Sequence, residues 1–292
     1  MKLGFIGLGA MGAHMAASLE RAGHAVQSFD LNGQGNRRSA REAAEGAEIF
    51  FTSLPGPVEV EAVSREISLP AGAAWFDLST NSPRRIRQLH EELSKRKVHF
   101  LDAPVSGGPQ GAKSGKLAIW VGGEQAIFDK YFPVLRCIGD QPLYVGPIGA
   151  GTVAKLAHNC TSFAVQAVLA EVFTLGVKAG VEPLALFKAL RQGATGRKRT
   201  FDRLPEHFLA GKYDPAAFTL RLAHKDMSLA LELAREVGVP MQIGEISFGE
   251  LSEAMQRGWS ERDCRVAMTL QEERAGVTAR AAADRLRAAL EE

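Results

Sequence analysis

The chain of 292 residues is long enough for one large domain or two ordinary ones. Hydrophobic residues make up 46% and charged residues 23%, the usual balance of a globular protein that buries a sizeable core. Because 35 basic residues nearly balance 33 acidic ones, the net charge of +2 gives no reason to expect a nucleic-acid or membrane partner.

The cysteines and the apolar runs indicate the class of protein and its compartment. Cys137, Cys160 and Cys264 are widely spaced and form no CxxC pair or zinc set with the seven histidines. We therefore expect free thiols and no metal. Neither a signal peptide nor an apolar run of the roughly 18 residues that a membrane span needs is seen. These features predict a soluble protein of the cytoplasm.

The first half of the chain alternates short apolar segments with helical ones. Strands are predicted at Lys2–Ile6, Ala25–Phe29, Ile49–Ser53, Ala74–Asp77, Val98–Asp102, Leu117–Val121 and Pro142–Val145. Helices are predicted at Ala10–Ala22 and Pro83–Lys97. This alternation is typical of an α/β domain with a doubly wound, mostly parallel sheet.

The pattern changes at the Gly/Pro cluster of residues 146–151, which marks a domain boundary. We place the boundary after residue 150, so that domains span residues 1–150 and 151–292. The second domain is predicted to be all-helical. Its expected helices run from Thr152 to Ala179, Pro183 to Gln192, Leu220 to Val237 and Gln242 to Arg257. The tail after Gly276 reads as a solvated amphipathic helix.

A glycine-rich motif follows the first predicted strand and opens the first predicted helix. It consists of Gly7, Leu8, Gly9, Ala10, Met11 and Gly12. The GxGxxG pattern alone is weak, but a strand–turn–helix context is the one in which it binds dinucleotides. There the pyrophosphate lies on the free N–H groups of the helix N-terminus. We therefore predict a bound NAD or NADP.

Asp30 ends the second predicted strand, near the position of the carboxylate that binds the adenosine ribose in such domains. A carboxylate accepts from the 2′-hydroxyl and repels a 2′-phosphate, which favours NAD. Arg37 and Arg38 follow closely and offer an alternative contact for a phosphate, although a solvated loop explains them as well. Asp30 itself has the alternative of an ordinary turn residue.

A second glycine-rich segment, Asp102–Gly108, follows another predicted strand, at the sheet edge where ligands bind in such folds. Ser106 offers a hydroxyl, and Gly107 and Gly108 expose backbone N–H groups. Together they make a candidate site for a substrate carboxylate. A plain glycine-rich turn is the alternative.

Lys155 and Asn159 are four residues apart on the long predicted helix and so share a face. A dehydrogenase needs a group that takes or gives the hydroxyl proton, and a lysine with a lowered pKa can do so. The alternative is a lysine on a solvated face. Lys225–Asp226 lies in an apolar stretch, either as a surface ion pair or with Lys225 against an anionic ligand.

Taken together, these segments resemble the β-hydroxyacid dehydrogenase family, which includes 3-hydroxyisobutyrate dehydrogenase and tartronate semialdehyde reductase. The resemblance covers most of the chain. It rests on four motifs in order: the Gly7–Gly12 loop with its helix, Asp102–Gly108, Gly149-x-Gly151-x-x-x-Lys155-x-x-x-Asn159, and Lys225–Asp226.

The resemblance implies roles for particular residues. It implies Lys155 as the catalytic acid/base with Asn159 as its partner. It implies carboxylate binding by Ser106, Gly107 and Gly108, with Lys225 near substrate or cofactor. Cofactor-lining residues would be Leu54, Pro55 and Thr80. It also implies a Rossmann domain, an all-helical domain built on a long interdomain helix, and a homodimer or homotetramer.

Some features depart from the family or leave the function open. His14 and Trp120 stand where relatives often have Asn and Met. The cations of Arg197–Arg199 would suit a second substrate anion, or simply a solvated loop. Imine reduction is a near alternative that Lys155 disfavours, and a non-catalytic dinucleotide-binding protein is a more distant one. 6-Phosphogluconate dehydrogenase itself would need a longer helical domain. The expected reaction is hydride transfer between NAD(P) and a small β-hydroxy acid or its semialdehyde or keto form.

Overall fold

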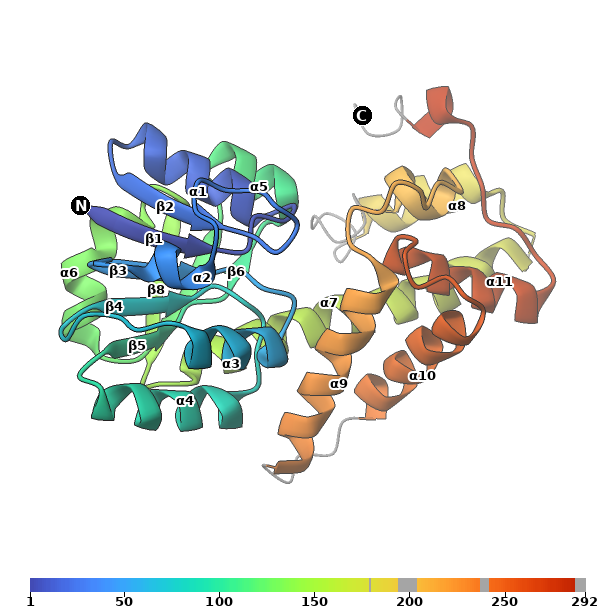
Figure 1. Cartoon of the computed structure of the whole chain (residues 1–292). Helices are drawn as coiled ribbons and strands as arrows, with labels where there is room; N and C mark the ends of the chain where they lie inside the picture. The colour runs from blue at the N-terminus through green and yellow to red at the C-terminus, as the bar shows by residue number, and fades with distance from the viewer. Residues whose placement is uncertain (179, 194–203, 237–241, 287–292) are drawn as a thin grey trace. The chain divides into compact units, whose positions relative to one another are not determined.

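The computed structural model describes residues 1–178, 180–193, 204–236 and 242–286 (Figure 1). The chain divides into two compact units, Met1–His158 and Asn159–Glu292. The division falls inside the long helix α7 (Ala150–Lys178), whereas the boundary predicted from the sequence lies at its first residue. Within the described part of the chain, no helix is long and apolar enough to cross a membrane.

The first unit is built on an eight-stranded sheet of order β2-β1-β3-β4-β5-β7-β6, with β8 paired to β7. The strands are β1 (Lys2–Ile6), β2 (Ala25–Phe29), β3 (Ile49–Thr52), β4 (Ala74–Asp77), β5 (His99–Asp102), β6 (Val105–Ser106), β7 (Ala118–Gly122) and β8 (Gln141–Gly146). Neighbours from β2 to β5 are parallel, and β7 is antiparallel to β5 and β6. The predicted doubly wound, mostly parallel sheet is confirmed.

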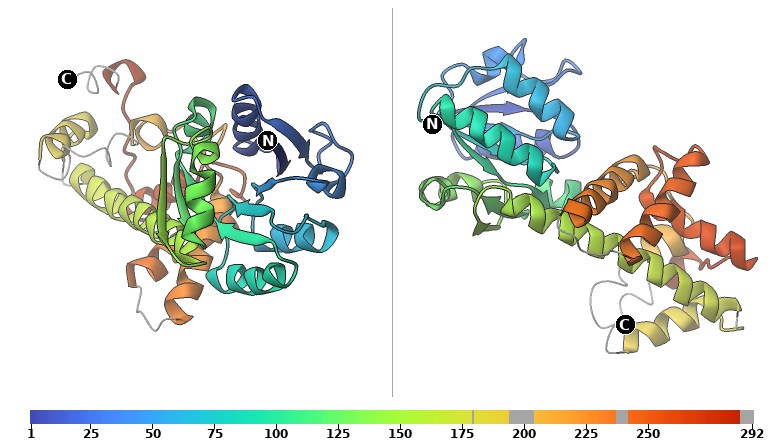
Figure 2. Two further views of the ribbon diagram at one scale, coloured as in Figure 1. Left: turned by 90° about the vertical axis from the view of Figure 1, so that its left-hand side faces the viewer. Right: turned by 90° about the horizontal axis from the view of Figure 1, so that it is seen from below.

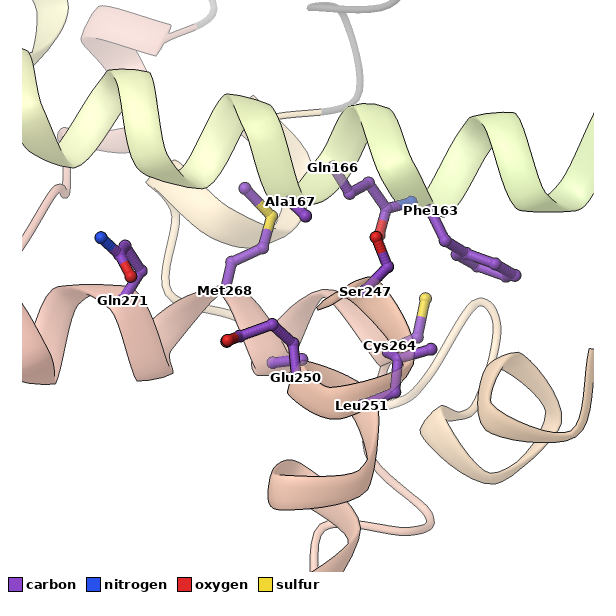
Figure 3. A pocket seen from close by; sticks show the side chains of 10 residues that line it. Phe163, Gln166, Ala167, Ser247, Glu250, Leu251, Cys264, Met268 and Gln271 are labelled. Carbon is purple, nitrogen blue, oxygen red and sulfur yellow. The ribbon is translucent and has the colours of Figure 1, made fainter. Parts of the chain in front are cut away.

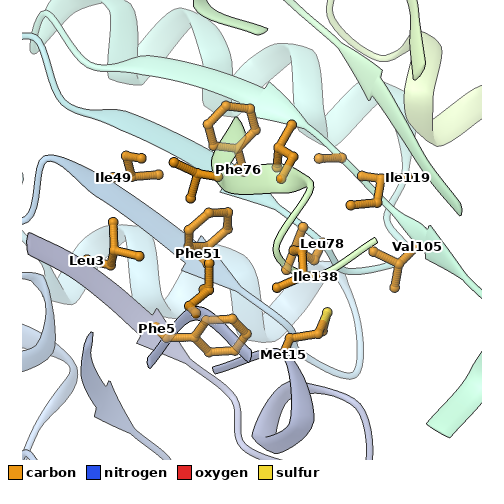
Figure 4. Packing of buried hydrophobic residues seen from close by; sticks show 14 of the residues in the cluster. Leu3, Phe5, Met15, Ile49, Phe51, Phe76, Leu78, Val105, Ile119 and Ile138 are labelled. Carbon is orange, nitrogen blue, oxygen red and sulfur yellow. The ribbon is translucent and has the colours of Figure 1, made fainter. Parts of the chain in front are cut away.

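Both faces of this sheet are apolar because successive side chains point to opposite faces. Phe51 and Phe76 stack on one face with ring centroids 5.8 Å apart (Figure 4). Their chain neighbours Phe50 and Trp75 meet edge to face on the other, with centroids 5.1 Å apart. A strand buried on both sides reads as a continuous apolar run, which is the pattern that predicted these strands.

Helices cover both faces of the sheet. The face with Phe51 is covered by α1 (Gly12–Arg21), α5 (Gly108–Ser114) and α6 (Gln125–Leu135). The opposite face is covered by α2 (Ala40–Ala44), α3 (Pro57–Glu66) and α4 (Pro83–Lys95). Figure 2 shows α3 and α4 side by side. This arrangement leaves the C-terminal ends of the parallel strands as the edge where ligands bind.

The regular elements among the described residues of the second unit are helices, as predicted, apart from one isolated bridge between Thr219 and Asp263. After α7 it contains α8 (Pro183–Gln192), η2 (Pro205–Leu209), α9 (Leu220–Glu236), α10 (Gln242–Gln256), η3 (Cys264–Met268) and α11 (Thr269–Ala275). One of its cores is centred on Phe187 and Phe208, both fully buried.

The prediction of a helix directly after Gly276 is wrong for residues 277–282, which are not helical. The carboxylate of Glu272 accepts from the backbone N–H of Ala279 and pairs with the Arg280 guanidinium at 2.6 and 2.8 Å. The N–H of Ala281 donates to the carbonyl oxygen of Leu209. These contacts hold the segment against the unit and bury Ala279, so local helix propensity is overridden.

Candidate active site

Glycine is present at the three positions of the first loop for different structural reasons. Gly7 adopts φ +95°, and a Cβ there would lie 2.2 Å from the carbonyl oxygen of Ser53. A Cβ on Gly12 would lie 1.8 Å from the carbonyl oxygen of Gly7. A Cβ on Gly9 would meet no atom within 4 Å. The fold itself therefore requires Gly7 and Gly12, whereas Gly9 leaves an open stretch of backbone that a ligand can approach.

The start of α1 has the properties of an anion site. No side chain caps the helix at Met11, and its first turn contains no acidic residue. The first N–H groups of a helix lack intrahelical partners, and the helix dipole favours negative charge beside them. With the open backbone at Gly9, these residues fit the pyrophosphate of a dinucleotide.

Asp30 follows the last residue of β2 and faces the same loop. Its Oδ2 accepts from the N–H of Leu8 at 2.6 Å, and its Oδ1 accepts from the N–H of Asn32 at 2.8 Å. Each carboxylate oxygen has a second lone pair for a ribose hydroxyl. Arg37 instead donates to the Gln27 side chain at 3.0 and 3.2 Å and to the carbonyl oxygen of Asn36.

A buried polar cluster holds the loops that follow β3 and β4. The Asp77 carboxylate accepts from the Thr52 hydroxyl at 2.9 Å and from the N–H of Ser79 at 3.1 Å. The Ser79 hydroxyl accepts from the N–H of Leu54 at 2.9 Å. Burial raises the pKa of Asp77. The cluster fixes the segments that contain the predicted cofactor residues Leu54, Pro55 and Thr80 at the C-terminal edge of the sheet.

Asp102, at the end of β5, caps the helix that carries the predicted catalytic lysine. Its two carboxylate oxygens accept from the N–H groups of Gly149 and Thr152, at 2.7 and 2.6 Å. Burial raises the pKa of Asp102 to about 6. Gly151 allows this close approach, because a Cβ there would lie 2.2 Å from the carbonyl oxygen of Trp120. The sequence analysis placed Asp102 in the Asp102–Gly108 segment but did not predict that its carboxylate caps the N-terminus of α7.

Ser106 lies at the end of β6 and contacts α7. Its Oγ is 3.2 Å from Nε2 of His158, whose ring packs on Trp120 with centroids 5.1 Å apart. After it come Gly107 and Gly108, with φ of +139° and +61°. A Cβ on Gly108 would meet nothing within 4 Å, so this backbone is open to a ligand.

Lys155 is half-buried on α7, three residues before His158. Residues three apart on a helix are neighbours on one face. The structure therefore brings the predicted carboxylate segment to the helix face that holds the predicted acid/base. His158 was missed in the sequence because a single histidine on a helix carries no recognisable pattern.

Asn159 and Lys225 belong to the second unit, where both contact Asp226. The Asn159 amide donates to Oδ2 of Asp226, and Nζ of Lys225 lies 2.9 Å from Oδ1. Asp226 is only 3% exposed. The pair singled out in the sequence is therefore no ordinary surface ion pair, because its carboxylate is buried and orients an asparagine. The sequence did not reveal this link, since residues 159 and 226 are far apart in the chain.

Comparisons with known proteins show the family to which the chain belongs. Residues 2–146 match the family model described as the NAD binding domain of 6-phosphogluconate dehydrogenase. Residues 149–270 match the model described as "NAD-binding of NADP-dependent 3-hydroxyisobutyrate dehydrogenase". The chain is 32% identical over 293 residues to 2-(hydroxymethyl)glutarate dehydrogenase of Eubacterium barkeri, covering 95% of this chain and 97% of that one.

The chain belongs to the β-hydroxyacid dehydrogenase family. An NAD-dependent L-serine dehydrogenase of Pseudomonas aeruginosa is 31% identical, over 92% of this chain and 97% of its own. The solved structure of Mycobacterium tuberculosis 3-hydroxyisobutyrate dehydrogenase with L-serine superposes with a TM-score of 0.82 at 27% identity, over 92% and 98% of the two chains. This β-hydroxyacid dehydrogenase is an NAD(P)-dependent oxidoreductase that acts on CH–OH groups.

A pocket within the second unit of this dehydrogenase is not the active site. It lies among α7, α10 and η3 and encloses about 40 Å³ (Figure 3). That space holds a water or two, not a nicotinamide or a hydroxy acid. None of the predicted site residues lines it. Among the described residues, no group of His, Cys, Asp and Glu is arranged to hold a metal ion. The Arg197–Arg199 segment lies outside the described residues.

Proposed function

We propose that this dehydrogenase oxidises a small 3-hydroxy acid to its semialdehyde or keto form with NAD, or catalyses the reverse reduction. The names of the relatives support this substrate class. 2-(Hydroxymethyl)glutarate, L-serine and 3-hydroxyisobutyrate each carry a carboxylate and a hydroxyl on the carbon β to it. A site for such acids needs an anion-binding group and a proton-transfer group at a fixed separation.

One observation carries the proposal. The contact between Ser106 and His158 brings the open backbone at Gly108 beside the α7 face on which Lys155 lies. A carboxylate bound by the Ser106 hydroxyl and the backbone N–H groups of Gly107 and Gly108 would present its β-hydroxyl toward that face.

The proposed roles follow from this arrangement. When bound, the nicotinamide supplies hydride chemistry at the alcohol carbon. Lys155 accepts the hydroxyl proton during oxidation and returns it during reduction. Asn159, oriented by Asp226, holds the reacting oxygen, and Lys225 contacts the substrate or cofactor. Leu54, Pro55 and Thr80 line the cofactor.

A preference for NAD over NADP is part of the proposal. The Asp30 carboxylate beside the first loop would accept from a ribose 2′-hydroxyl and repel a 2′-phosphate. The guanidinium of Arg37 is already bound by Gln27 and Asn36, which makes it a poor phosphate ligand. We also propose that the chain forms a homodimer or homotetramer, which analytical ultracentrifugation would test.

The decisive experiment measures formation of NADH from NAD and of NADPH from NADP, in parallel, at 340 nm. The substrates are 3-hydroxyisobutyrate, glycerate, threonate, serine and 3-hydroxypropionate. We expect turnover of at least one acid and a lower KM for NAD than for NADP. Tight NADH binding without turnover of any acid would contradict the proposed reaction and redirect the search to imines.

Ser106→Ala tests the carboxylate site in the same assay. We expect a KM for the acid that is raised roughly tenfold, because a hydrogen bond to a charged group is lost. The KM for 2-methylpropane-1,3-diol, which replaces the carboxylate of 3-hydroxyisobutyrate by an alcohol, should not change. An equal loss with both compounds would remove Ser106 from this role.

A further inference from the structure

His158 is an exposed imidazole close to two proposed site residues, Ser106 for the substrate carboxylate and Lys155 for proton transfer. Its Nε2 lies 3.2 Å from the Ser106 hydroxyl, and it follows Lys155 by three residues on α7. The Trp120 ring packs against it with centroids 5.1 Å apart and so limits the orientations of the imidazole.

The direction of the hydrogen bond decides what Ser106 can offer a ligand. A hydroxyl has one proton. If Nε2 carries a hydrogen, it donates to Ser106 Oγ, and the serine proton remains available to a carboxylate. If Nε2 is bare, the serine proton is used on the ring, and Oγ presents only lone pairs, which repel a carboxylate.

We propose that His158 is a positioning residue that sets the donor direction of Ser106 and thereby makes carboxylate binding depend on its own protonation. The imidazolium holds a hydrogen on both ring nitrogens, so Ser106 is then always a donor toward the substrate. The neutral ring samples both tautomers, and one of them disables the serine. This inference rests on the proposed function only in placing the substrate carboxylate at Ser106.

Other titratable groups near this histidine can be separated from it. The residues that contact it from β6 and β7, Ser106 and Trp120, do not titrate between pH 5 and 9. On α7 itself, Lys155 precedes it and Cys160 follows, with a thiol pKa raised by burial. Asp102, whose carboxyl pKa is raised to about 6, bonds the start of the helix. All three remain in variants of His158, so their effects cancel in a comparison.

The kinetic test follows KM for 3-hydroxyisobutyrate from pH 6 to pH 8.5. For the wild type we expect a rise of roughly two- to threefold, because the neutral ring leaves the Ser106 proton available in only one of its two tautomers. In His158→Gln, whose amide does not titrate, the ratio of KM at the two pH values should be close to one. His158→Leu removes the acceptor that competes for the Ser106 proton, so its KM should also be independent of pH. The KM for NAD should be the same in all three proteins.

Two controls assign the effect to the carboxylate and to this histidine. The KM for 2-methylpropane-1,3-diol should show no difference in pH dependence between wild type and His158→Gln. His99→Gln removes a histidine at the opposite end of β5, paired with Glu124 at 2.8 Å, and should retain the wild-type KM profile. An unchanged KM ratio in His158→Gln would overturn the inference.

A binding measurement keeps the inference testable apart from turnover. NMR titration of the His158 ring, assigned by its loss in His158→Gln, is carried out on the NADH-bound protein with and without the hydroxy acid. We expect the acid to raise the pKa of His158 by a few tenths of a unit, the logarithm of the roughly two- to threefold difference in affinity. A raised pKa without turnover would support the inference while contradicting the reaction. Turnover together with an unchanged pKa of His158 would overturn the inference and leave the proposed reaction standing. An unchanged pKa without turnover would overturn both.

Discussion

At the scale of single residues, Lys155 is the side chain on which the proposed chemistry depends most. We expect Lys155→Ala to lower kcat by roughly 10² to 10⁴, the usual contribution of a general acid/base. The Kd for NADH should stay within a few-fold, because the cofactor loop lies on other elements. Stopped-flow turnover and fluorescence titration of NADH measure the two quantities.

Lys95→Ala is the matched control, because this exposed lysine lies in the last turn of α4, away from the proposed site. It should retain wild-type kcat. If Lys155→Ala turned over as fast as Lys95→Ala, the acid/base would have to be another group.

Asp30 is the residue that we expect to select the cofactor. Asp30→Ala removes an acceptor for the ribose hydroxyl and a charge that repels the 2′-phosphate. The Kd for NAD should therefore rise while that for NADP stays level or falls, so the ratio of the two dissociation constants changes roughly tenfold.

The Asp30 carboxylate also accepts from the N–H of Leu8, so Asp30→Asn serves as the companion variant that keeps an acceptor without the charge. If the cofactor preference were unaltered in both variants, Arg38 and not Asp30 would be the residue that selects the cofactor.

At the scale of elements, two glycines of the β1–α1 loop are expected to serve different purposes. Gly12 is required by the packing of the fold, whereas Gly9 leaves room for the proposed cofactor. Gly9→Ala adds a Cβ into open space, so we expect an unchanged melting temperature and a Kd for NADH raised tenfold or more. Gly12→Ala forces a Cβ to within 1.8 Å of the Gly7 carbonyl oxygen, so it should lower the melting temperature by several degrees.

Differential scanning fluorimetry and NADH titration of both variants check this contrast. Gly23→Ala is a useful third variant, because Gly23 has φ +86° but no neighbour within 4 Å. It should destabilise modestly through backbone strain alone and leave NADH binding unaltered. Normal NADH affinity in Gly9→Ala would count against a pyrophosphate at this loop.

The start of α7 shows what element-level sequence patterns reveal and what they leave out. The absence of proline and the run of helix-forming residues predicted this helix to within two residues at its N-terminus. Its cap is Asp102, a residue from a strand well upstream in the chain. A local capping signal is therefore missing from the sequence, since the partner is supplied by the tertiary fold.

At the scale of the whole molecule, buried carboxyls make the stability of the first unit depend on pH. The pKa of Asp102 is about 6 in the folded chain, against the ordinary value of 3.8 expected in the unfolded chain. Between pH 3.8 and pH 6 the folded chain therefore binds more protons than the unfolded chain. Stability from this group is present at low pH and is lost as pH rises through 6. Asp77 acts in the same direction.

Asp102→Asn isolates this effect. The difference in unfolding free energy between wild type and variant should shrink by on the order of 1 kcal/mol from pH 5 to pH 8. Urea unfolding in a Trp259→Phe background measures it, because the fluorescence then comes from Trp75 and Trp120 of the first unit. A difference that grew with pH would mean that ionised Asp102 is the favoured form.

The sequence by itself determined the fold class and most of the strands and long helices, and it indicated the segments that we propose to bind cofactor and substrate. Those features are local: apolar periodicity fixes an element, and glycine at Gly7 and Gly12 is required by backbone geometry within one strand–turn–helix unit. The contacts of Ser106 with His158, of Asp102 with α7 and of Asp226 with Asn159 were decided only by the tertiary structure. Each joins residues distant in the chain, and no local pattern records which polar side chains meet when apolar faces are buried.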